Sequence, residues 1–339
     1  MGFIVARAPF RLSFAGGGTD LPSFYNQDPG QVVSTTINKY VYVVINSRDH
    51  IFGKGIDDPF SYKFRLSYSD TENVHSADEI SHPIVREALK LLEIDDPLDI
   101  ATMADIPAGT GLGSSGTFTV SLLHALHTYK GEEPNPQQLA EEAAHIEINL
   151  LNRPVGKQDH YAAAFGGLNT YSFNINGTVE VEPLNINHNI TESIFDALLL
   201  LNTGISRSSS SVLDEQNSNT ELNREYLLNI KQHAQEARQI IKDGFNVEKF
   251  GQLLNNTWQQ KRKLATNIST SIIDGWYDKA LNNGAIGGKI CGAGGGGFLL
   301  LVINPDLRTE TRNSLKDLAD LEIKYEPTGS EILISTSAS

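Results

Sequence analysis

Glycines gather in three clusters along this chain of 339 residues, and the middle cluster is the best suited to chemistry. The three clusters hold twelve of the 29 glycines. The middle one, Pro107-Ala-Gly-Thr-Gly-Leu-Gly-Ser-Ser-Gly116, follows a strand-like segment and precedes a helix-like one. Glycine allows tight turns that bring backbone N–H groups close to a ligand, and the start of a helix attracts anions. With the hydroxyls of Ser114 and Ser115 beside it, this loop is predicted to bind phosphate, most often that of a nucleotide.

The same loop allows two other interpretations. Residues 111–116 match the G-x-G-x-x-G pattern of dinucleotide-binding proteins. Glu132 and Glu133 follow near the position where that pattern places the acidic residue that binds the ribose. That pattern belongs to a βαβ unit, however, and here a polar loop follows the next predicted helix. The sequence contains neither a Walker A pattern nor the HRD and DFG elements of protein kinases. A tight turn without a ligand is the remaining alternative.

A carboxylate on an apolar helix face is the second chemical feature. The spacing predicts a helix over residues 137–151, and Glu147 falls in the middle of its apolar arc. A buried carboxylate is unfavourable unless it is paired or binds a cation. Two interpretations stay open: Glu147 binds a metal or another functional partner, or it forms a core salt bridge with Arg11 or Arg153.

Three further residues have chemical potential. Asp20 directly follows the glycine turn at residues 16–18. Its carboxylate is placed to accept hydrogen bonds from neighbouring sugar hydroxyls, or else to cap the next segment. Asp159 and Lys157 lie in a loop before an alanine run, and their local sequence alone assigns them no role.

Bulk composition limits the choice of partners and location. The net charge is −14, which argues against nucleic acid or an anionic membrane as the main partner. Any anion site must therefore use backbone N–H groups and a few local cations. The single cysteine, Cys291, excludes an internal disulfide, no apolar run approaches ~20 residues, and the first residues do not resemble a signal peptide. We expect a cytoplasmic protein, and the sequence makes no prediction about its oligomeric state.

Strand-like and helix-like segments alternate without a regular βαβ order, which predicts an α+β architecture in two domains, residues 1–190 and 191–339. A polar stretch at 185–193 is the candidate boundary, and a Ser-rich loop is expected at 206–220. The expected strands are 3–15 (interrupted at Pro9), 32–46, 62–68, 98–103, 167–174, 178–184, 195–201, 298–303 and 331–336. The expected helices are 83–93, 117–129, 137–151 and two or three within 220–284.

The three glycine motifs, in this order, resemble those of the GHMP kinase superfamily, which includes galactokinase and the homoserine, mevalonate and phosphomevalonate kinases. Residues 107–116 resemble its motif 2, PxxxGLGSSAA, with Gly116 in place of the usual alanine. Residues 289–298 resemble motif 3, and residues 11–20 resemble motif 1 in a variant with GGGTD. The resemblance extends from residue 7 to about residue 300.

This resemblance implies a fold with an N-terminal part like ribosomal protein S5 domain 2 and a ferredoxin-like C-terminal part. It implies ATP as co-substrate, Mg²⁺ bound by Ser115 and Glu147, and Asp159 as the base or orienting carboxylate beside Arg11. The residues implied to bind the ATP phosphates are Pro107, Gly109, Gly111, Leu112, Gly113, Ser114, Ser115 and Gly116. Those implied for the sugar side are Gly17, Gly18, Thr19, Asp20, Gly294 and Gly295.

Within the superfamily, the strings RAPFRLSFAGGGTDLP, GKQDHYAAAFGG and TGISRSSS are most similar to bacterial D-glycero-D-manno-heptose 7-phosphate kinases. That similarity implies phosphate transfer to the anomeric hydroxyl of a sugar phosphate. We expect Arg207 or Lys157 to bind the phosphate of the substrate, and a flexible Ser-rich lid is the alternative for Arg207. The rival functions are another GHMP kinase, a non-catalytic sugar and ATP sensor, and a nicotinamide oxidoreductase.

Overall fold

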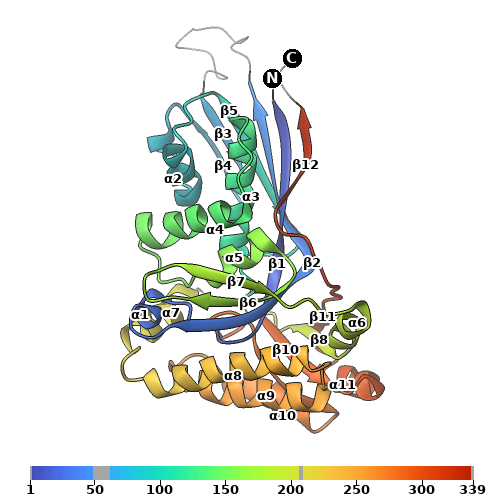
Figure 1. Cartoon of the computed structure of the whole chain (residues 1–339). Coiled ribbons are helices and arrows are strands. Elements are labelled where there is room, and N and C mark those ends of the chain that lie inside the picture. Colours follow the sequence, from blue (N-terminus) through green and yellow to red (C-terminus); the bar gives the residue numbers. More distant parts are fainter. Residues whose placement is uncertain (1, 49–61, 206–208, 337–339) are drawn as a thin grey trace.

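The strands of the computed structural model, which describes residues 2–48, 62–205 and 209–336, form two sheets (Figure 1). The larger sheet has the order β12-β1-β2-β5-β3-β4, with β6 paired to β2 and β7 to β6. Its strands are β1 (Phe3–Ala15), β2 (Gly30–Ser47), β3 (Phe64–Ser67), β4 (Thr71–Val74), β5 (Leu98–Ala104), β6 (Leu168–Phe173), β7 (Val179–Pro183) and β12 (Glu331–Thr336). The smaller sheet has the order β11-β8-β10-β9, from β8 (Leu198–Asn202), β9 (Ala285–Ile290), β10 (Phe298–Ile303) and β11 (Ala319–Asp320).

Helices cover the two sheets in separate groups, as Figure 1 shows. The first group comprises α2 (Pro83–Leu91), α3 (Ser114–Tyr129), α4 (Pro136–Ala144) and α5 (Gln158–Phe165), beside the larger sheet. The second comprises α8 (Arg224–Lys242), α9 (Val247–Lys261) and α10 (Ser271–Leu281), in the layer next to the smaller sheet. The other helices are α1 (Pro22–Tyr25), α6 (His188–Asp196), α7 (Ser209–Ser218) and α11 (Arg308–Ser314). This arrangement confirms the predicted α+β class.

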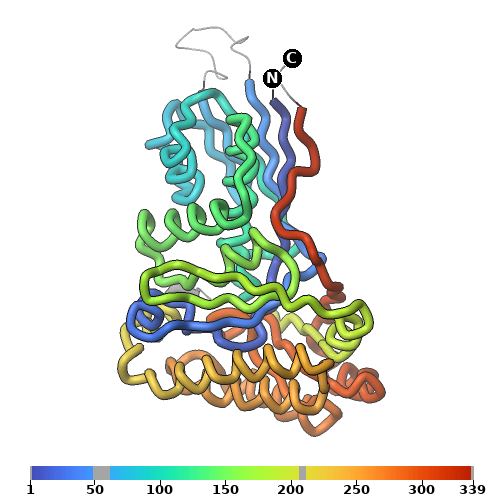
Figure 2. Tube along the Cα trace, viewed as in Figure 1, coloured from blue at the N-terminus to red at the C-terminus, as the bar shows by residue number. Residues whose placement is uncertain are grey.

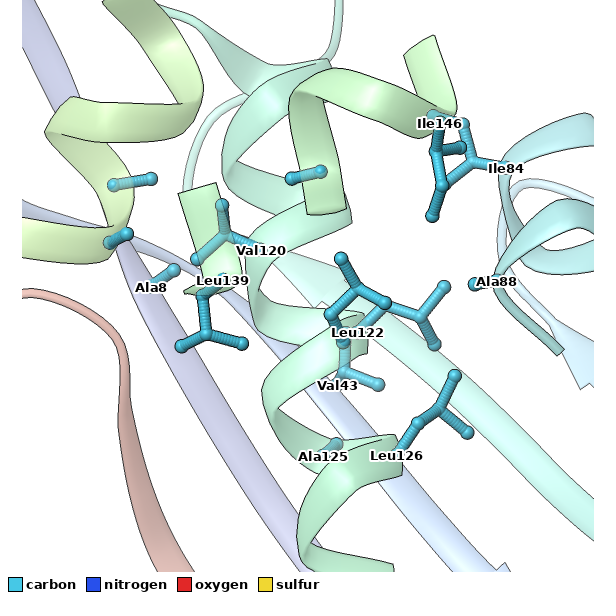
Figure 3. Close-up of a cluster of buried hydrophobic side chains, with 14 of the residues drawn as sticks. Ala8, Val43, Ile84, Ala88, Val120, Leu122, Ala125, Leu126, Leu139 and Ile146 are labelled. Carbon is cyan, nitrogen blue, oxygen red and sulfur yellow. The ribbon is translucent and has the colours of Figure 1, made fainter. Parts of the chain in front are cut away.

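The long strand β1 contributes to two of the three hydrophobic clusters that the described residues form. Ala6 and Ala8 belong to the core beneath α3, where Val120 and Leu122 pack near Val43 of β2 (Figure 3). Farther along the same strand, Phe10, Leu12 and Phe14 belong to a core shared with α8, α9 and the smaller sheet. The Phe14 ring meets the edge of the Phe250 ring of α9 at a centroid distance of 5.2 Å. One strand therefore fixes the position of both helix layers, as its course in Figure 2 shows.

Pro9 does not interrupt β1, in contrast to the prediction from the sequence. The strand continues from Phe3 to Ala15, but its register with β2 shifts between Pro9 and Arg11. Proline has no backbone N–H to donate to a neighbouring strand, which makes a bulge the natural accommodation. Just beyond the shift, the Arg11 backbone N–H donates to Leu112 O at 3.2 Å. The irregularity thus ties β1 to the central glycine loop.

The last strand, β12, returns to the larger sheet and pairs with β1 in antiparallel fashion. Its first residue, Glu331, accepts a hydrogen bond from Arg7 Nε at 2.6 Å. The chain after residue 190 thus supplies the smaller sheet and also one strand of the larger sheet. The division into residues 1–190 and 191–339 stays a prediction.

The structure differs from the expectations in three further places, although the boundary at 185–193 itself stays a prediction. The polar stretch at 185–193 contains the start of α6, which Asn187 caps by accepting a hydrogen bond from Ile190 N at 2.9 Å. Residues 209–218 of the expected Ser-rich loop form α7, where Val212 and Gln216, one helical turn apart, are buried. Strand β9 was not predicted because Gly287 and Gly288 remove its apolar alternation. A Cβ at Gly287 would lie 2.0 Å from Gly251 O, so α9 packs directly on this strand.

We expect Gly329→Ala to destabilise the protein because a Cβ there would lie 2.1 Å from Ala164 O, just before β12 docks. Crowding of this kind lowers the free energy of unfolding by about 1–3 kcal/mol. The matched control is Gly275→Ala, in the exposed middle of α10, where a Cβ meets nothing within 4 Å. That variant should gain up to ~1 kcal/mol through helix propensity. Denaturant unfolding of both variants tests this, and equal midpoints would contradict it.

Candidate active site

A cavity of about 180 Å³ lies between the central glycine loop and the layer of α9 and β9. It brings together four residues that the sequence singled out: Arg11, Asp20, Ser115 and Asp159. The other predicted residues in its lining are Gly17, Gly18, Gly109, Gly111, Gly113 and Ser114. Residues from both sheets and both helix layers therefore face one space.

The central glycine loop has the geometry that an anion-binding loop requires. Gly109, Gly111 and Gly113 adopt φ values of 78°, 84° and 84°, which favour glycine strongly. Gly113 is the N-cap of α3 and provides no side-chain cap. The first N–H groups of α3 thus remain available for a ligand, and the helix dipole adds positive potential there.

The third glycine cluster supports the central loop by close backbone contact. A Cβ at Gly111 would lie 2.5 Å from Cys291 O, and one at Gly297 would lie 2.3 Å from Thr110 O. Among the described residues, Gly292 lines the cavity but Gly294 and Gly295 do not. Gly295 instead donates its N–H to Ile268 O at 2.8 Å. A substrate role for Gly294 and Gly295 stays a prediction that the lining does not support.

Arg11 and Asp159 form an ion pair at the cavity wall. Arg11 donates to Asp159 Oδ1 from Nε at 2.8 Å and from Nη2 at 2.6 Å, and its Nη1 donates to Gly111 O at 2.7 Å. The Arg11 side chain is only 5% exposed, whereas that of Asp159 is 28% exposed. Asp159 Oδ2 has no hydrogen-bond partner among residues 2–48, 62–205 and 209–336. One oxygen of Asp159 is therefore fixed, and the other remains free for a ligand.

Glu147 is buried, as its place on the apolar arc predicts, and its oxygens are fully occupied. The helix widens here into a π-helical turn, His145–Leu150, of the kind often found at functional sites. Oε2 accepts from Ser115 Oγ at 2.6 Å and from Arg153 Nη1 at 2.9 Å; Oε1 lies 3.2 Å from His160 Nε2. Burial opposes ionisation, but His160, Ser115 and Arg153 outweigh it and hold the pKa of Glu147 at about 2. Arg153, not Arg11, is thus its salt-bridge partner.

Ser115 and Glu147 fit a magnesium ion by their chemistry. Their oxygens are 2.6 Å apart, and Mg²⁺ prefers one or two protein oxygens completed by water and substrate phosphate. Among the described residues there is no group of three or more His, Cys, Asp or Glu that could hold a metal ion. With these two protein oxygens, water and nucleotide phosphates would complete the coordination of a bound magnesium ion.

Asp20 lines the cavity next to the first glycine turn and is held there by hydrogen bonds. Oδ1 accepts from Gly18 N at 2.9 Å, and Oδ2 accepts from Gln158 Nε2 at 3.0 Å. Burial and then the charge of Asp159 raise the pKa of Asp20 above its ordinary value. Helix α1 begins after Leu21 without a side-chain cap, so Asp20 does not cap it. Gly156 is required beside it, since a Cβ there would lie 1.9 Å from Asp20 Oδ2.

Several predicted residues do not belong to the described lining of the cavity. Thr19 is fully buried and donates to Gly16 O at 2.8 Å, and Leu112 is a core residue. Lys157 donates to Gly177 O at 2.5 Å and lies 5.0 Å from the centre of the Tyr25 ring. Like Pro107 and Gly116, these residues are not among the described residues that line the cavity. Arg207 lies outside the described residues.

Gly116, which departs from the alanine of motif 2, lies where α3 touches α5. A Cβ at this position would lie 2.9 Å from Asp159 Cβ and 3.2 Å from His160 N. Glycine thus lets Asp159 approach the start of α3 closely. The change from alanine has a steric reason.

Sequence reasoning assigned no role to two buried lysines in the lining, Lys261 and Lys289. It also missed His160 and Gln158, which belong to α5; Asp159 therefore lies in the first turn of a helix and not in the predicted loop. A signal for Lys261 was present: it continues the apolar stripe of α9 after Leu254 and Trp258. His160 had no such signal, since its contact with Glu147 depends on how α5 packs.

The dinucleotide-binding interpretation lacks its structural context. A Rossmann unit requires a parallel strand after the helix that follows the glycine loop. Here α3 is followed by α4 and α5, and the next strand, β6, pairs with β2 in antiparallel fashion. In the part of the chain that the structure describes, no helix is long and apolar enough to cross a membrane.

Comparisons with known proteins match the chain to two family models, the GHMP kinases N terminal domain over residues 83–167 and the GHMP kinases C terminal domain over residues 237–320. The chain is 30% identical over 328 residues to the D-glycero-alpha-D-manno-heptose 7-phosphate kinase of Campylobacter jejuni, covering 93% of each protein. It is 29% identical over 350 residues to the L-fucokinase/L-fucose-1-P guanylyltransferase of Bacteroides fragilis, covering 92% of this chain and 36% of that protein.

Solved structures share the fold. A D-glycero-D-manno-heptose 1-phosphate kinase from Bacteroides thetaiotaomicron superposes with a TM-score of 0.79 at 24% identity, covering 98% of this chain and 100% of the other. The galactokinase of Lactococcus lactis in complex with galactose gives a TM-score of 0.74 at 17% identity, covering 97% and 95%. At these identities the likeness shows the two-domain fold alone.

Asp159→Asn should leave nucleotide binding within about twofold and lower kcat by about 10²–10⁴-fold, because the amide keeps the shape but cannot accept a proton as a base. Steady-state kinetics and binding of a non-hydrolysable ATP analogue test this. Asp317→Asn, on the exposed surface, is the control. Turnover near that of the wild type would remove Asp159 from the chemistry.

Glu147→Gln should raise the magnesium concentration required for half-maximal activity by about tenfold or more, since the amide lacks the charge that attracts the ion. The measurement is a magnesium titration at saturating ATP, with Glu322→Gln as the exposed control. Thermal unfolding of the variant shows whether the loss of its contacts with Arg153 and His160 disturbs the fold. An unchanged magnesium titration in a folded variant would exclude Glu147 as a magnesium ligand and leave it only the salt bridge with Arg153.

Proposed function

Since the chain belongs to the GHMP kinase family and is a kinase with an alcohol group as acceptor, we propose that its acceptor is D-glycero-D-manno-heptose 7-phosphate. The γ-phosphate of ATP would pass to the anomeric hydroxyl and give the 1,7-bisphosphate. The similarity over 93% of both chains to a heptose 7-phosphate kinase supports this choice among sugars. The cytoplasmic location stays a prediction from the sequence.

The observation that carries the proposal is the Arg11–Asp159 pair beside the start of α3 in one cavity. The helix start and its glycine loop would bind the ATP phosphates, and Asp20 on the other side would bind sugar hydroxyls. An acceptor oxygen near Asp159 would then face the γ-phosphate. Holding the two reactants in such an arrangement supplies a large part of the rate enhancement in phosphoryl transfer.

In this proposal Asp159 orients the acceptor hydroxyl and receives its proton at Oδ2. Arg11 occupies Oδ1 with two donors, which fixes the carboxylate plane and leaves Oδ2 facing the acceptor. An anomeric hydroxyl is more acidic than an ordinary alcohol, so a carboxylate suffices as base. The N–H groups at the start of α3 offset charge that develops on the transferring phosphoryl group.

We propose Ser115 and Glu147 as the magnesium ligands. The hydroxyl and the ionised carboxylate are oxygen donors of the kind the ion prefers, and His160 and Thr119 orient Glu147 Oε1 at 3.2 and 3.1 Å. When bound, magnesium would neutralise part of the charge of the triphosphate. Arg153, which contacts both Ser115 Oγ and Glu147 Oε2 at 2.9 Å, would have to share these oxygens or turn away.

A second candidate acceptor is L-fucose, because the chain is 29% identical to the B. fragilis fucokinase over 92% of its length. Fucose carries no phosphate, whereas the heptose substrate does. The two candidates therefore differ in the anionic group that the cavity must accommodate.

We expect kcat/KM for D-glycero-D-manno-heptose 7-phosphate to exceed that for L-fucose, galactose and mevalonate by about 100-fold or more, since a polar site strongly rejects acceptors that leave its donors unpaired. ADP release across this panel measures the ratio, and the ³¹P–¹H coupling of the product identifies the anomeric phosphate. Asp159→Asn serves as the background control. A higher kcat/KM for fucose would contradict the heptose proposal and favour the second candidate.

A further inference from the structure

Two buried lysines line the cavity from the layer of α9 and β9. Lys261 ends α9 and is 8% exposed, and Lys289 lies in β9 and is 3% exposed. Lysine is almost never fully buried unless its charge is compensated. Their position therefore requires a physical explanation.

Backbone carbonyls use only part of the donor capacity of these lysines. Lys289 Nζ donates to Phe14 O at 3.0 Å. Lys261 Nζ donates to Ile290 O at 3.3 Å and to Gly292 O. An ammonium group has three donors, so at least one N–H of each lysine remains. Within the described ranges, neither lysine forms an ion pair with a carboxylate.

The charges around the two lysines are unbalanced. Burial and then the neighbouring Lys289 lower the pKa of Lys261 to about 7, and burial lowers that of Lys289 to about 8. Arg11 adds a third positive charge, but Asp159 pairs with it. Asp20 is the other carboxylate among the described residues that line the cavity. Hydrogen bonds from Gly18 and Gln158 already hold its two oxygens. An additional anion would relieve this repulsion.

Resting on the function proposed above, we propose that Lys261 and Lys289 bind the phosphate ester that the sugar substrate already carries. Lys289 Nζ contacts Phe14 O, and Phe14 lies two residues before the Gly16–Gly18 turn that leads to Asp20. In the proposed function this is the acceptor side of the cavity. The start of α3 already provides a separate set of donors for the ATP phosphates. Lys157, which the sequence suggested as a ligand of the substrate phosphate, instead donates to Gly177 O and lies over the Tyr25 ring.

The test uses Lys261→Gln and Lys289→Gln in the full chain, because glutamine can still donate to the backbone carbonyls but lacks the charge. The Kd of heptose 7-phosphate should rise about 10- to 100-fold, as expected for loss of a charged hydrogen bond. The Kd values of the unphosphorylated heptose and of a non-hydrolysable ATP analogue should stay within about twofold. Lys263→Gln, two residues beyond Lys261 and exposed, is the matched control.

Wild-type protein gives a second measurement that does not depend on the folding of a variant. Inorganic phosphate should inhibit competitively against heptose 7-phosphate and not against ATP. Competition against ATP alone, equal weakening of both heptoses in the variants, or weakening of the nucleotide only would overturn the inference. If the wild type phosphorylates no heptose phosphate, the proposed function fails; if it does and only the lysine results are negative, this inference fails alone.

Discussion

The contact between two glycine loops is the constraint on which the rest of the site depends. The loop before α3 comes from the larger sheet, and the loop between β9 and β10 comes from the smaller one. At Gly111 and Gly292 the backbones approach so closely that a Cβ on Gly292 would lie 2.4 Å from Gly111 Cα. No side chain fits there, so glycine on both loops is the condition for one cavity with walls from both sheets.

Basic residues outnumber carboxylates in the described lining of the cavity, in contrast to the net charge of the whole chain. The chain has a net charge of −14, yet Arg11, Lys261 and Lys289 are buried around one small space. Surface carboxylates repel anions, but salt at physiological concentration screens this repulsion at distances beyond about 8–10 Å. Salt screens the attraction of buried cations for a ligand much less. Backbone N–H groups also attract anions, and they do so at any pH because they do not titrate. An acidic protein can thus bind two phosphorylated ligands without a basic surface.

Regular periodicity made much of the fold predictable, and irregular contacts account for most of the errors. Strands β5, β10 and β12 and helices α2 and α3 lie close to their predicted ranges because their apolar residues repeat. Helix α7 was missed because serine favours loops in isolation, and β9 because glycines replaced its side chains. The partners of Glu147 were only half predictable: Arg153 is six residues away, whereas His160 depends on how α5 packs.

Glu147 and Lys261 show that one rule identifies both sides of the site. Each is a charged residue on the apolar stripe of a helix, and each is buried at the cavity or directly behind it. The rule was applied to Glu147 and not to Lys261, although Leu254 and Trp258 precede that lysine on its stripe. Burying either charge is unfavourable without a partner of opposite charge. Arg153 and His160 compensate Glu147, whereas Lys261 forms no ion pair with a carboxylate among the described residues. In the function proposed above, the carboxylate of Glu147 would lie on the side of the metal-bound triphosphate and the ammonium group of Lys261 on the side of the anionic acceptor.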